Sequence, residues 1–429
     1  MQLSTEYLIS AKHIYIAYSG GLDSHVLLHL CSVNPQIKNK ITAVYVHHGL
    51  QKIADDWAAH CQQQSQLLEI DCKILSIDAT ASKGESPEEV AREARYHALK
   101  KLMEKDDVLL VAQHQDDQLE TVLLQLFRGA GVQGLSAMAE ISAFGQGQLI
   151  RPLLSYSQQS LKNYAIEQHL HWVEDPSNQC DDFERNFLRN QIIPSLKTHW
   201  PTLDKTVARS AKHCANAQQL LTEVATQLLT KLINVDNSLS IDGLLLLNSP
   251  QQSLVIRQWF AALNLKMPSV TFIAQLFNDV IAAKKSSNPI LKRNDCHIRR
   301  YQNKLYCLNP ENNSVKSQIW LQSDLHLSLS QTHSLQRLPS KQGISQHLWH
   351  ISTVSIRYRI GGEKINLPYR RGHHTLKKLF QEVGIPPWER EQIPLIYFDD
   401  KLVAVADLWI DSYSVGLTDE DCYQLKWHR

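Results

Sequence analysis

SGGLDS, residues 19–24, decides the fold of the N-terminal part: it follows an apolar run and precedes the helical run HVLLHL at residues 25–30. Its two glycines allow a tight turn that brings backbone N–H groups close to an anion, and the following helix adds its positive end. The hydroxyl groups of Ser19 and Ser24 can donate hydrogen bonds. Asp23 would repel a bare phosphate, so we expect it to face Mg²⁺ or to orient the loop. We therefore predict a phosphate-binding loop; the alternative is an ordinary turn between a strand and a helix.

The first 155 residues alternate apolar runs with helix-length segments. Five runs predict strands, namely HIYIAYS (13–19), ITAVYVHH (41–48), CKILSID (72–78), DVLLVAQH (107–114) and QLIRPLL (148–154). Such strands, separated by helices, indicate a doubly wound α/β domain with a parallel sheet. Ligands of these sheets lie beyond the carboxyl ends of the strands. A further helix is expected at 86–104, where Ser86, Pro87 and Glu89 form a capping signal.

The remaining chain predicts two further domains. Residues from about 205 to 300 carry apolar residues at helical spacing, which predicts a helical domain. The segment 310–345 is rich in Asn, Ser and Gln and predicts linker and short strands. The last hundred residues predict a small α/β or α+β domain with a helix at 375–383 and two later strands. We expect domains at residues 1–205, 206–330 and 331–429.

Composition narrows the class of protein. The chain has 429 residues, of which 43% are hydrophobic and 20% are charged, as in ordinary globular proteins. It has no signal-peptide pattern and no run of about 18 apolar residues, so we expect a cytoplasmic protein with no membrane partner. Its eight cysteines form no CxxC pair and no zinc motif, so we expect reduced thiols.

The net charge is only +1, but basic residues cluster near the C-terminus. Its members are Arg357, Arg359, Lys364, Arg370, Arg371, Lys377 and Lys378. Tyr369 and Trp388 lie nearby in the sequence. Such a cluster suits a folded RNA, which is bound largely through phosphates and shape, although a solvated basic face is the alternative.

Longer stretches resemble a known family. SGGLDS resembles the PP-loop of ATP pyrophosphatases, which cleave ATP to AMP and pyrophosphate and activate an oxygen as an adenylate. Four ordered matches resemble the tRNA(Ile)-lysidine synthetases: GESPEEVAREARY (84–96), AQHQDDQLETVLLQLFRGAGVQGLSAM (112–138), WVEDPSNQCDDFERNFLRN (172–190), and RIGGEKI (359–365) with LKKLFQEVGIPPWER (376–390).

The resemblance implies a ligase that uses ATP and Mg²⁺. Its reaction would attach free lysine to C2 of the wobble cytidine of tRNA(Ile) with a CAU anticodon, through an adenylated RNA. The product, lysidine, changes the codon specificity from AUG to AUA. Whether the chain is a monomer or a homodimer stays open.

Two carboxylates are candidate catalytic residues. Asp117 and Glu120 lie one turn apart on the helix expected after residue 114, where they can hold Mg²⁺ or receive an ammonium group. The resemblance assigns them to catalysis or lysine binding. The alternative is that they only complement the helix dipole, and this is what we expect of Asp116.

Other candidates surround the same strand ends. His47 and Gln113 end two strands and are expected near the nucleotide, although His47 and His48 can equally be structural. Gln51 stands where the family has an arginine, so a phosphate contact from this position is in doubt.

Several arginines are candidate phosphate or RNA contacts. Arg185 and Arg189 lie one turn apart and can stabilise phosphate charge, or else pair with Glu174, Asp175 or Asp181. Arg92 and Arg95 can bind phosphate, pair with the Asp117 helix or stay solvated. Arg128 opens a GxGxxG loop that follows a helix, so it is no dinucleotide site, and the resemblance implies that RNA approaches there.

We thus predict three groups of site residues. The catalytic group is Asp23, Asp117, Glu120 and Arg189, with Asp23 as the metal ligand. The ATP-binding group is Ser19, Gly20, Gly21, Leu22, Asp23, Ser24, His47 and Gln113. The substrate-binding group is Arg92, Arg95, Asp117, Glu120, Arg128, Arg185, Arg370, Arg371, Lys377 and Lys378.

Two rival functions remain. One is tRNA thiolation by another PP-loop enzyme, which the scattered cysteines oppose. The other is a tRNA-binding homologue without activity, which the intact SGGLDS, Asp117, Glu120 and Arg189 oppose.

Overall fold

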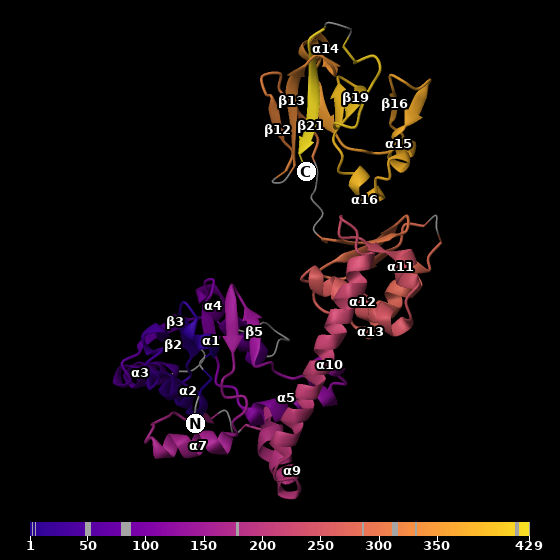
Figure 1. Cartoon of the computed structure of the whole chain (residues 1–429). Helices are drawn as coiled ribbons and strands as arrows, with labels where there is room; N and C mark the ends of the chain where they lie inside the picture. Colours follow the sequence, from indigo (N-terminus) through magenta and orange to yellow (C-terminus); the bar gives the residue numbers. More distant parts are fainter. Residues whose placement is uncertain are drawn as a thin grey trace. The chain divides into compact units, whose positions relative to one another are not determined.

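The computed structural model describes residues 1–429 apart from 2, 5, 48–52, 79–86, 177–179, 285–286, 311–315, 331–332, 417–419 and 429. The chain forms two compact units, Met1–Val224 and Ala225–Arg429 (Figure 1). His48, Gln51 and the expected cap Ser86 lie outside the described residues.

The first unit contains a six-stranded sheet with the order β3-β2-β1-β4-β6-β5. Its strands are β1 (Ile14–Ala17), β2 (Ile41–His47), β3 (Asp71–Ser76), β4 (Val108–Leu110), β5 (Ile141–Phe144) and β6 (Gly147–Ile150). Neighbours pair in parallel, except that β5 and β6 are antiparallel. The five strands expected from the sequence are confirmed. β5 is an addition, joined to β6 by a short turn at Gly145, whose φ is +61°.

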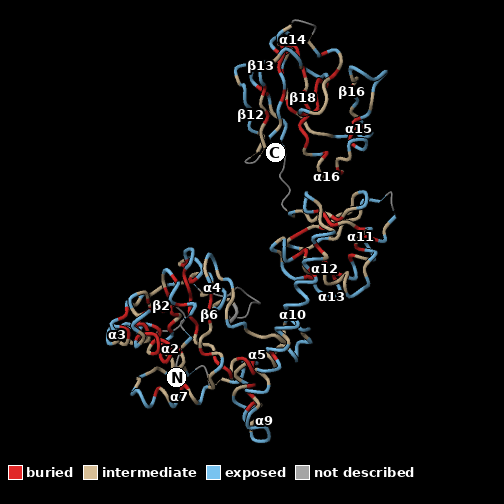
Figure 2. The backbone as a smooth tube through the Cα atoms, viewed as in Figure 1, coloured by how far each residue is buried: buried red, intermediate tan, exposed pale blue. Residues whose placement is uncertain are grey.

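Helices cover both faces of this sheet, which confirms the doubly wound arrangement. They are α1 (Glu6–Ile9), α2 (Leu22–Ser32), η1 (Lys38–Lys40), α3 (Ile53–Leu67), α4 (Pro87–Leu102), α5 (Gln115–Phe127), α6 (Val132–Leu135) and α7 (Gln158–Glu167). One core cluster joins α2, α3 and α7 to the sheet through residues such as Leu27, Cys61 and Leu161. A second joins α4 to the other face through Leu99 and Met103. Buried residues concentrate in β1, β2, β4 and α2 (Figure 2).

The chain continues through α8 (Glu184–Phe187), the π-helical turn η3 (Leu188–Ile192), α9 (Ile193–His199) and α10 (Leu203–Leu232), and the first unit ends within α10 at Val224. Leu188 and Ile193 pack with Leu119 of α5 in a small separate core. This packing holds the segment beside α5. α10 is continuous through residue 205, where a boundary was expected.

The second unit begins with helices, as expected, and then adds a sheet. The helical elements are α11 (Ile241–Leu245), α12 (Ser249–Ala262), α13 (Val270–Gln275) and the π-helical η4 (Leu276–Ile281). The strands are β7 (Leu239–Ser240), β8 (Ile290–Lys292), β9 (His297–Tyr301) and β10 (Lys304–Leu308), in the order β7-β10-β9-β8. Trp259 and Phe260 are fully buried between the helices and this sheet.

The C-terminal part of this unit is mostly strands. They are β11 (Gln318–Ile319), β12 (His326–Ser328), β13 (Ser334–Ser340), β14 (Ile344–Ser345), β15 (Val354–Arg357), β16 (Lys364–Asn366), β17 (His373–Thr375), β18 (Leu395–Phe398), β19 (Lys401–Val405), β20 (Trp409–Ile410) and β21 (Cys422–His428). Its helices are α14 (Gln346–Ile351), α15 (Leu376–Glu382) and α16 (Pro387–Arg390). The expected helix at 375–383 and the two strands after it are confirmed. β12 and β13, on either side of residue 330, pair with each other.

The strands after β10 form two larger sheets, β11-β15-β18-β19-β20 and β12-β13-β21-β14, and a hairpin of β16 and β17. Trp320 and Trp349 are buried between the two larger sheets. None of the described helices is long and apolar enough to cross a membrane.

Candidate active site

The expected phosphate-binding loop lies between β1 and α2. Gly20 has a φ of +80°, and a Cβ there would lie 3.0 Å from Cys61 Sγ and 3.1 Å from Val173 Cγ2. Only glycine fits this backbone without strain. Ser24 Oγ accepts a hydrogen bond from the Ser19 N–H (3.2 Å) and donates one to the Gly21 carbonyl (3.0 Å). The first turn of α2 has no side-chain cap at Gly21, so its N–H groups can bind an anion.

His114 connects this loop to α5. Its Nε2 lies 3.5 Å from Asp23 Oδ2 and 3.5 Å from Asp117 Oδ2, and its side chain is only 2% exposed. Burial alone would lower the pKa of His114, but the hydrogen bond to Asp23 and the charges of Asp117, Asp23 and Asp116 together raise that pKa. An imidazolium ion between Asp23 and Asp117 reduces the repulsion between their two carboxylates.

Asp23 fits the role of a magnesium ligand. Its Oδ1 is buried without a hydrogen-bond partner, so a hard cation would satisfy it. Among the described residues no three His, Cys, Asp or Glu side chains are grouped to hold a metal by themselves. Mg²⁺ commonly binds through one or two carboxylates together with substrate phosphates, and this loop offers that donor set.

Asp117 and Glu120 form a four-residue ion network with Arg185 and Arg189. Glu120 accepts from Arg185 Nε at 2.6 Å and from Arg189 Nε at 2.6 Å. Asp117 Oδ1 lies 3.4 Å from a terminal nitrogen of Arg185 and 3.3 Å from one of Arg189. Burial would lower the pKa of Arg189, but its hydrogen bond and charge interaction with Glu120 raise it. The described ion pairs of these two arginines are therefore with the candidate catalytic carboxylates Asp117 and Glu120.

The two carboxylates differ in accessibility. The Asp117 side chain is 16% exposed, whereas that of Glu120 is 1% exposed. Glu120 is therefore enclosed by the guanidinium groups, and Asp117 remains the more accessible to a ligand.

Asp116 does more than complement the helix dipole, which corrects the expectation for it. It accepts from the Gln158 N–H at 2.8 Å and forms an ion pair with Lys197. Burial would raise the pKa of Asp116, but these two contacts, with the charge of His114, lower it. Asp116 thus ties α5 to α7 and α9.

The other predicted residues of the first unit occupy the rim of the sheet. His47 Nε2 lies 3.0 Å from Asp55 Oδ1, and Gln113 Oε1 accepts from Arg151 Nε at 2.5 Å. Arg92 lies over the Tyr96 ring, 5.2 Å from its centroid. Burial, with the positive charge of Arg92, lowers the pKa of Arg151 against the opposing effect of Tyr96.

Arg128 forms an ion pair of 2.7 Å with Glu184, and both side chains are well exposed. This contact brings the end of α5 to the start of α8. The glycines after it belong to a helix stop and loop, as expected: α5 ends at Phe127, and Gly129 has a φ of +68°.

Arg151 and Lys197 were missed from the sequence, and His114, which ends the strand expected at 107–114, was given no role. Arg151 follows the parallel strand β6, so the rule that ligands lie beyond the carboxyl ends of parallel strands could have singled it out. Lys197 gives no comparable local signal.

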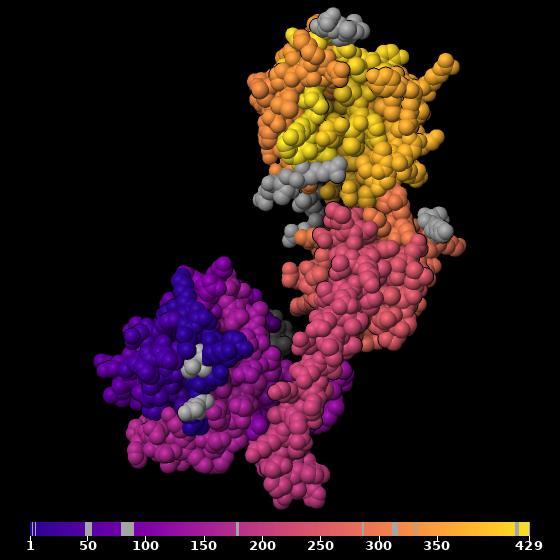
Figure 3. Space-filling model, in the orientation of Figure 1, coloured from indigo at the N-terminus to yellow at the C-terminus, as the bar shows by residue number. Residues whose placement is uncertain are grey.

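The predicted basic residues belong to the second unit, in the part of the chain that is orange to yellow in Figure 3. Arg370 pairs with Glu382 at 2.6 Å, and Tyr369 is 99% exposed. Arg371, Lys377 and Lys378 are also exposed. Trp388, in contrast, packs against Tyr306 with a centroid separation of 5.2 Å. It therefore belongs to the contact with β10 and not to the exposed basic cluster.

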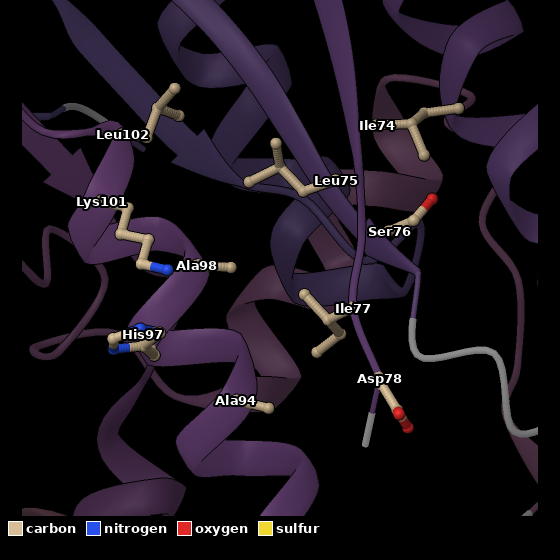
Figure 4. A pocket seen from close by; sticks show the side chains of 10 residues that line it. All are labelled: Ile74, Leu75, Ser76, Ile77, Asp78, Ala94, His97, Ala98, Lys101 and Leu102. Atoms are coloured by element: carbon tan, nitrogen blue, oxygen red, sulfur yellow. The ribbon is translucent and has the colours of Figure 1, made fainter. Parts of the chain in front are cut away.

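A hollow of about 540 Å³ lies between β3 and α4 (Figure 4). Its polar lining residues include Ser76, Asp78, His97 and Lys101. None of the predicted site residues lines it. It is separate from the phosphate loop and the ion network.

Comparisons with known proteins find relatives over nearly the whole chain. The chain matches the PP-loop domain family over residues 2–196, the TilS substrate binding domain over 239–306 and the TilS substrate C-terminal domain over 354–427. The tRNA(Ile)-lysidine synthase of Pectobacterium atrosepticum is 39% identical over 419 residues, covering 97% of this chain and 94% of that protein. That of Vibrio parahaemolyticus is 39% identical over 433 residues, covering 100% and 97%.

A solved structure, the U34-tRNA thiolase NcsA from Methanococcus maripaludis, is 18% identical with a TM-score of 0.41, covering 49% of this chain and 75% of that one. The full-length relatives and the three domain matches together identify the family. The chain belongs to the tRNA(Ile)-lysidine synthase family.

Proposed function

We propose that this enzyme attaches lysine to C2 of the wobble cytidine of tRNA(Ile) with a CAU anticodon, and so converts the codon specificity from AUG to AUA. It is an ATP-dependent carbon–nitrogen ligase that modifies tRNA. The observation that carries the proposal is the connection of the phosphate loop to the Asp117 and Glu120 network through His114. A nucleotide-activating loop and an amine-binding carboxylate are the two parts that such a ligase needs.

The first step activates the base. Cytidine O2 attacks the α-phosphorus of ATP; an O–P bond forms, the bond to the β-phosphate oxygen breaks, and pyrophosphate leaves. The N–H groups of residues 20–24 bind phosphate oxygens, and Asp23 would hold Mg²⁺. Mg²⁺, when bound, neutralises charge on the phosphates.

Arg185 and Arg189 then stabilise the charge that develops on the transferred phosphate. Their pairing with Glu120 fixes both guanidinium planes before substrates arrive.

The second step forms the new bond. The ε-amine of lysine attacks C2; the C–N bond forms, the C–O bond breaks, and AMP leaves. Asp117 is the accessible carboxylate, so we assign to it the contact with the ammonium group and its proton. Glu120 acts as a positioning residue through the two arginines.

We also propose three domains along the chain. The first boundary lies within α10, near the expected residue 205. The second belongs before β11 rather than at 330, because β12 and β13 pair.

The exposed Arg370, Arg371, Lys377 and Lys378 contact the RNA outside the anticodon.

The test measures incorporation of radiolabelled lysine. The full chain is incubated with ATP, Mg²⁺, labelled lysine and either tRNA(Ile) with a CAU anticodon or tRNA(Met). We expect label only in tRNA(Ile), lost in Asp23→Ala and retained in the exposed control Asp71→Asn on β3. ATP turnover to AMP without label would favour another PP-loop reaction, and no turnover would favour an RNA-binding role.

A further inference from the structure

Residues Phe183–Asn190 contain one pattern twice: Phe183-Glu184-Arg185-Asn186 and Phe187-Leu188-Arg189-Asn190. The segment is helical through α8 and η3. Residues four apart lie on the same side of a helix, so the repeat produces four rows of side chains.

Three of these rows have partners in the first unit. The arginine row binds Asp117 and Glu120, as described above. In the asparagine row, Asn186 donates to the Cys180 carbonyl and Asn190 to Asp181, each at 2.9 Å. These bonds hold the preceding loop against the helix.

The row of Glu184 and Leu188 is also engaged. Glu184 pairs with Arg128, and Leu188, only 4% exposed, packs with Leu119 and Ile193.

The phenylalanine row faces solvent instead. Phe183 is 39% exposed and Phe187 is 46% exposed. Phe127, at the end of α5, is 68% exposed and directly precedes Arg128. Arg128 pairs with Glu184, the residue after Phe183, so this ion pair links the segment that carries Phe127 to the segment that carries Phe183 and Phe187. Burial of a phenylalanine ring is favourable, so exposed rings on two segments that are linked in this way indicate a binding surface.

We propose that Phe127, Phe183 and Phe187 form a stacking surface for unpaired nucleotides of the RNA that flank the target cytidine. This proposal rests on the proposed function. A target base must leave its stack to reach an active site, and unstacked bases are bound by aromatic rings. Each of the three phenylalanines stands one or two residues before an arginine, so the same segment offers rings to bases and guanidinium groups to phosphates.

The distance from the ion network suits this occupant. Arg185 and Arg189 follow the rings by two residues, and the two rows lie on different sides of a helix that is about 10 Å across. A base on the rings would thus neighbour, in the RNA, the nucleotide whose O2 meets the network.

The first experiment measures KM for tRNA in the lysine incorporation assay. The variants are Phe183→Leu with Phe187→Leu, the conservative pair Phe183→Tyr with Phe187→Tyr, and the control Ile166→Ala, which removes an exposed apolar side chain of α7 (57% exposed). We expect the Leu pair to raise KM for tRNA about 10-fold, since a base on an aromatic ring contributes that much or more. The Tyr pair and the control should stay within about 2-fold of the unmodified enzyme, as stacking needs only the ring.

A second experiment reports stacking directly and does not require turnover. An anticodon stem-loop RNA with 2-aminopurine beside the target cytidine is titrated with each variant. Its fluorescence should be quenched by the unmodified enzyme and the Tyr pair, and much less by the Leu pair.

Unchanged KM and unchanged quenching in the Leu pair would overturn the proposal. A lowered melting temperature of the Leu pair with unchanged KM and quenching would also overturn it and would indicate that the rings contribute to the stability of the fold instead. If the unmodified enzyme forms no lysidine, the proposed function fails; the quenching then decides the stacking surface by itself.

Discussion

Replacing Glu120 by Gln removes the negative charge of the side chain and keeps its shape, so it measures what this charge contributes to stability. Glu120 is 1% exposed and accepts three charge-assisted hydrogen bonds, at 2.6, 2.6 and 2.9 Å, from Arg185 and Arg189. Gln retains one acceptor oxygen, but its NH₂ group faces guanidinium donors. Hydrogen bonds to charged groups contribute about 1.5–3 kcal/mol each, and breaking one side of a buried pair costs about 3–5 kcal/mol. Because the side chains of Arg185 and Arg189 are 27% and 31% exposed, water replaces part of the lost interaction. We therefore expect the free energy of unfolding to fall by about 2–3 kcal/mol.

The assay is calorimetric unfolding of the full chain, following the transition of the first unit. A loss of this size lowers Tm by roughly 4–12 °C for a domain of about 200 residues. The matched control is Glu184→Gln, which also breaks a pair between glutamate and arginine. Its partners, Glu184 and Arg128, are 71% and 63% exposed, so the control should lose about 0–1 kcal/mol.

Lysidine formation should fall at least 100-fold in Glu120→Gln, since both guanidinium groups lose their fixed orientation, and stay near normal in Glu184→Gln. Equal Tm values for the two variants would refute the claim that burial makes the Glu120 network strong. Normal activity of Glu120→Gln would refute its positioning role.

Three further substitutions test the loop and its neighbours. Gly20→Ala should weaken ATP binding, measured by calorimetric titration, at least 10-fold, and lower the free energy of unfolding by about 1–2 kcal/mol. The reason is that φ is +80° at this position and that an added Cβ has no room. Unchanged ATP binding would contradict a preformed loop. Asp116→Asn should destabilise the enzyme at pH 6–7. Since the pKa of Asp116 is lowered in the folded state, the stability that its charge contributes is present above the unfolded pKa of about 4 and is lost as pH falls through the folded pKa. A difference in stability between the two proteins that persists in acid would count against this prediction. His114→Gln should show the opposite dependence of stability on pH. The pKa of His114 is raised on folding, so the stability that its charge contributes is present below about pH 6.5 and is lost as pH rises through the folded pKa. A stability difference that grows from pH 6 to pH 9 would contradict the contact with Asp23.

The parts of the fold that the sequence predicted are those with a strong local pattern. β1 to β4 lie within apolar runs of seven or eight residues, and α2 and α5 follow glycine-rich or capping signals. β9 and β10 were not predicted, because their turn at Gln302 and Asn303 contains no glycine, although Gln302 has a φ of +51°. Their neighbour β8 has only three residues, too few to show a period. Short strands of this kind are specified by their tertiary partners rather than by their own sequence.

In the candidate site, too, single residues differ for reasons that their own local sequence does not contain. In the sequence Asp117 and Glu120 are equivalent, since both are acidic and they lie one turn apart on one face of a helix. Their difference arises from Arg185 and Arg189, which are more than sixty positions away and enclose Glu120 while leaving part of Asp117 open. A carboxylate that is enclosed by two guanidinium groups offers no free face to a substrate amine, whereas a partly exposed carboxylate does. The division of roles that we propose for the two residues therefore depends on the folded unit, and exchanging their environments should exchange their roles.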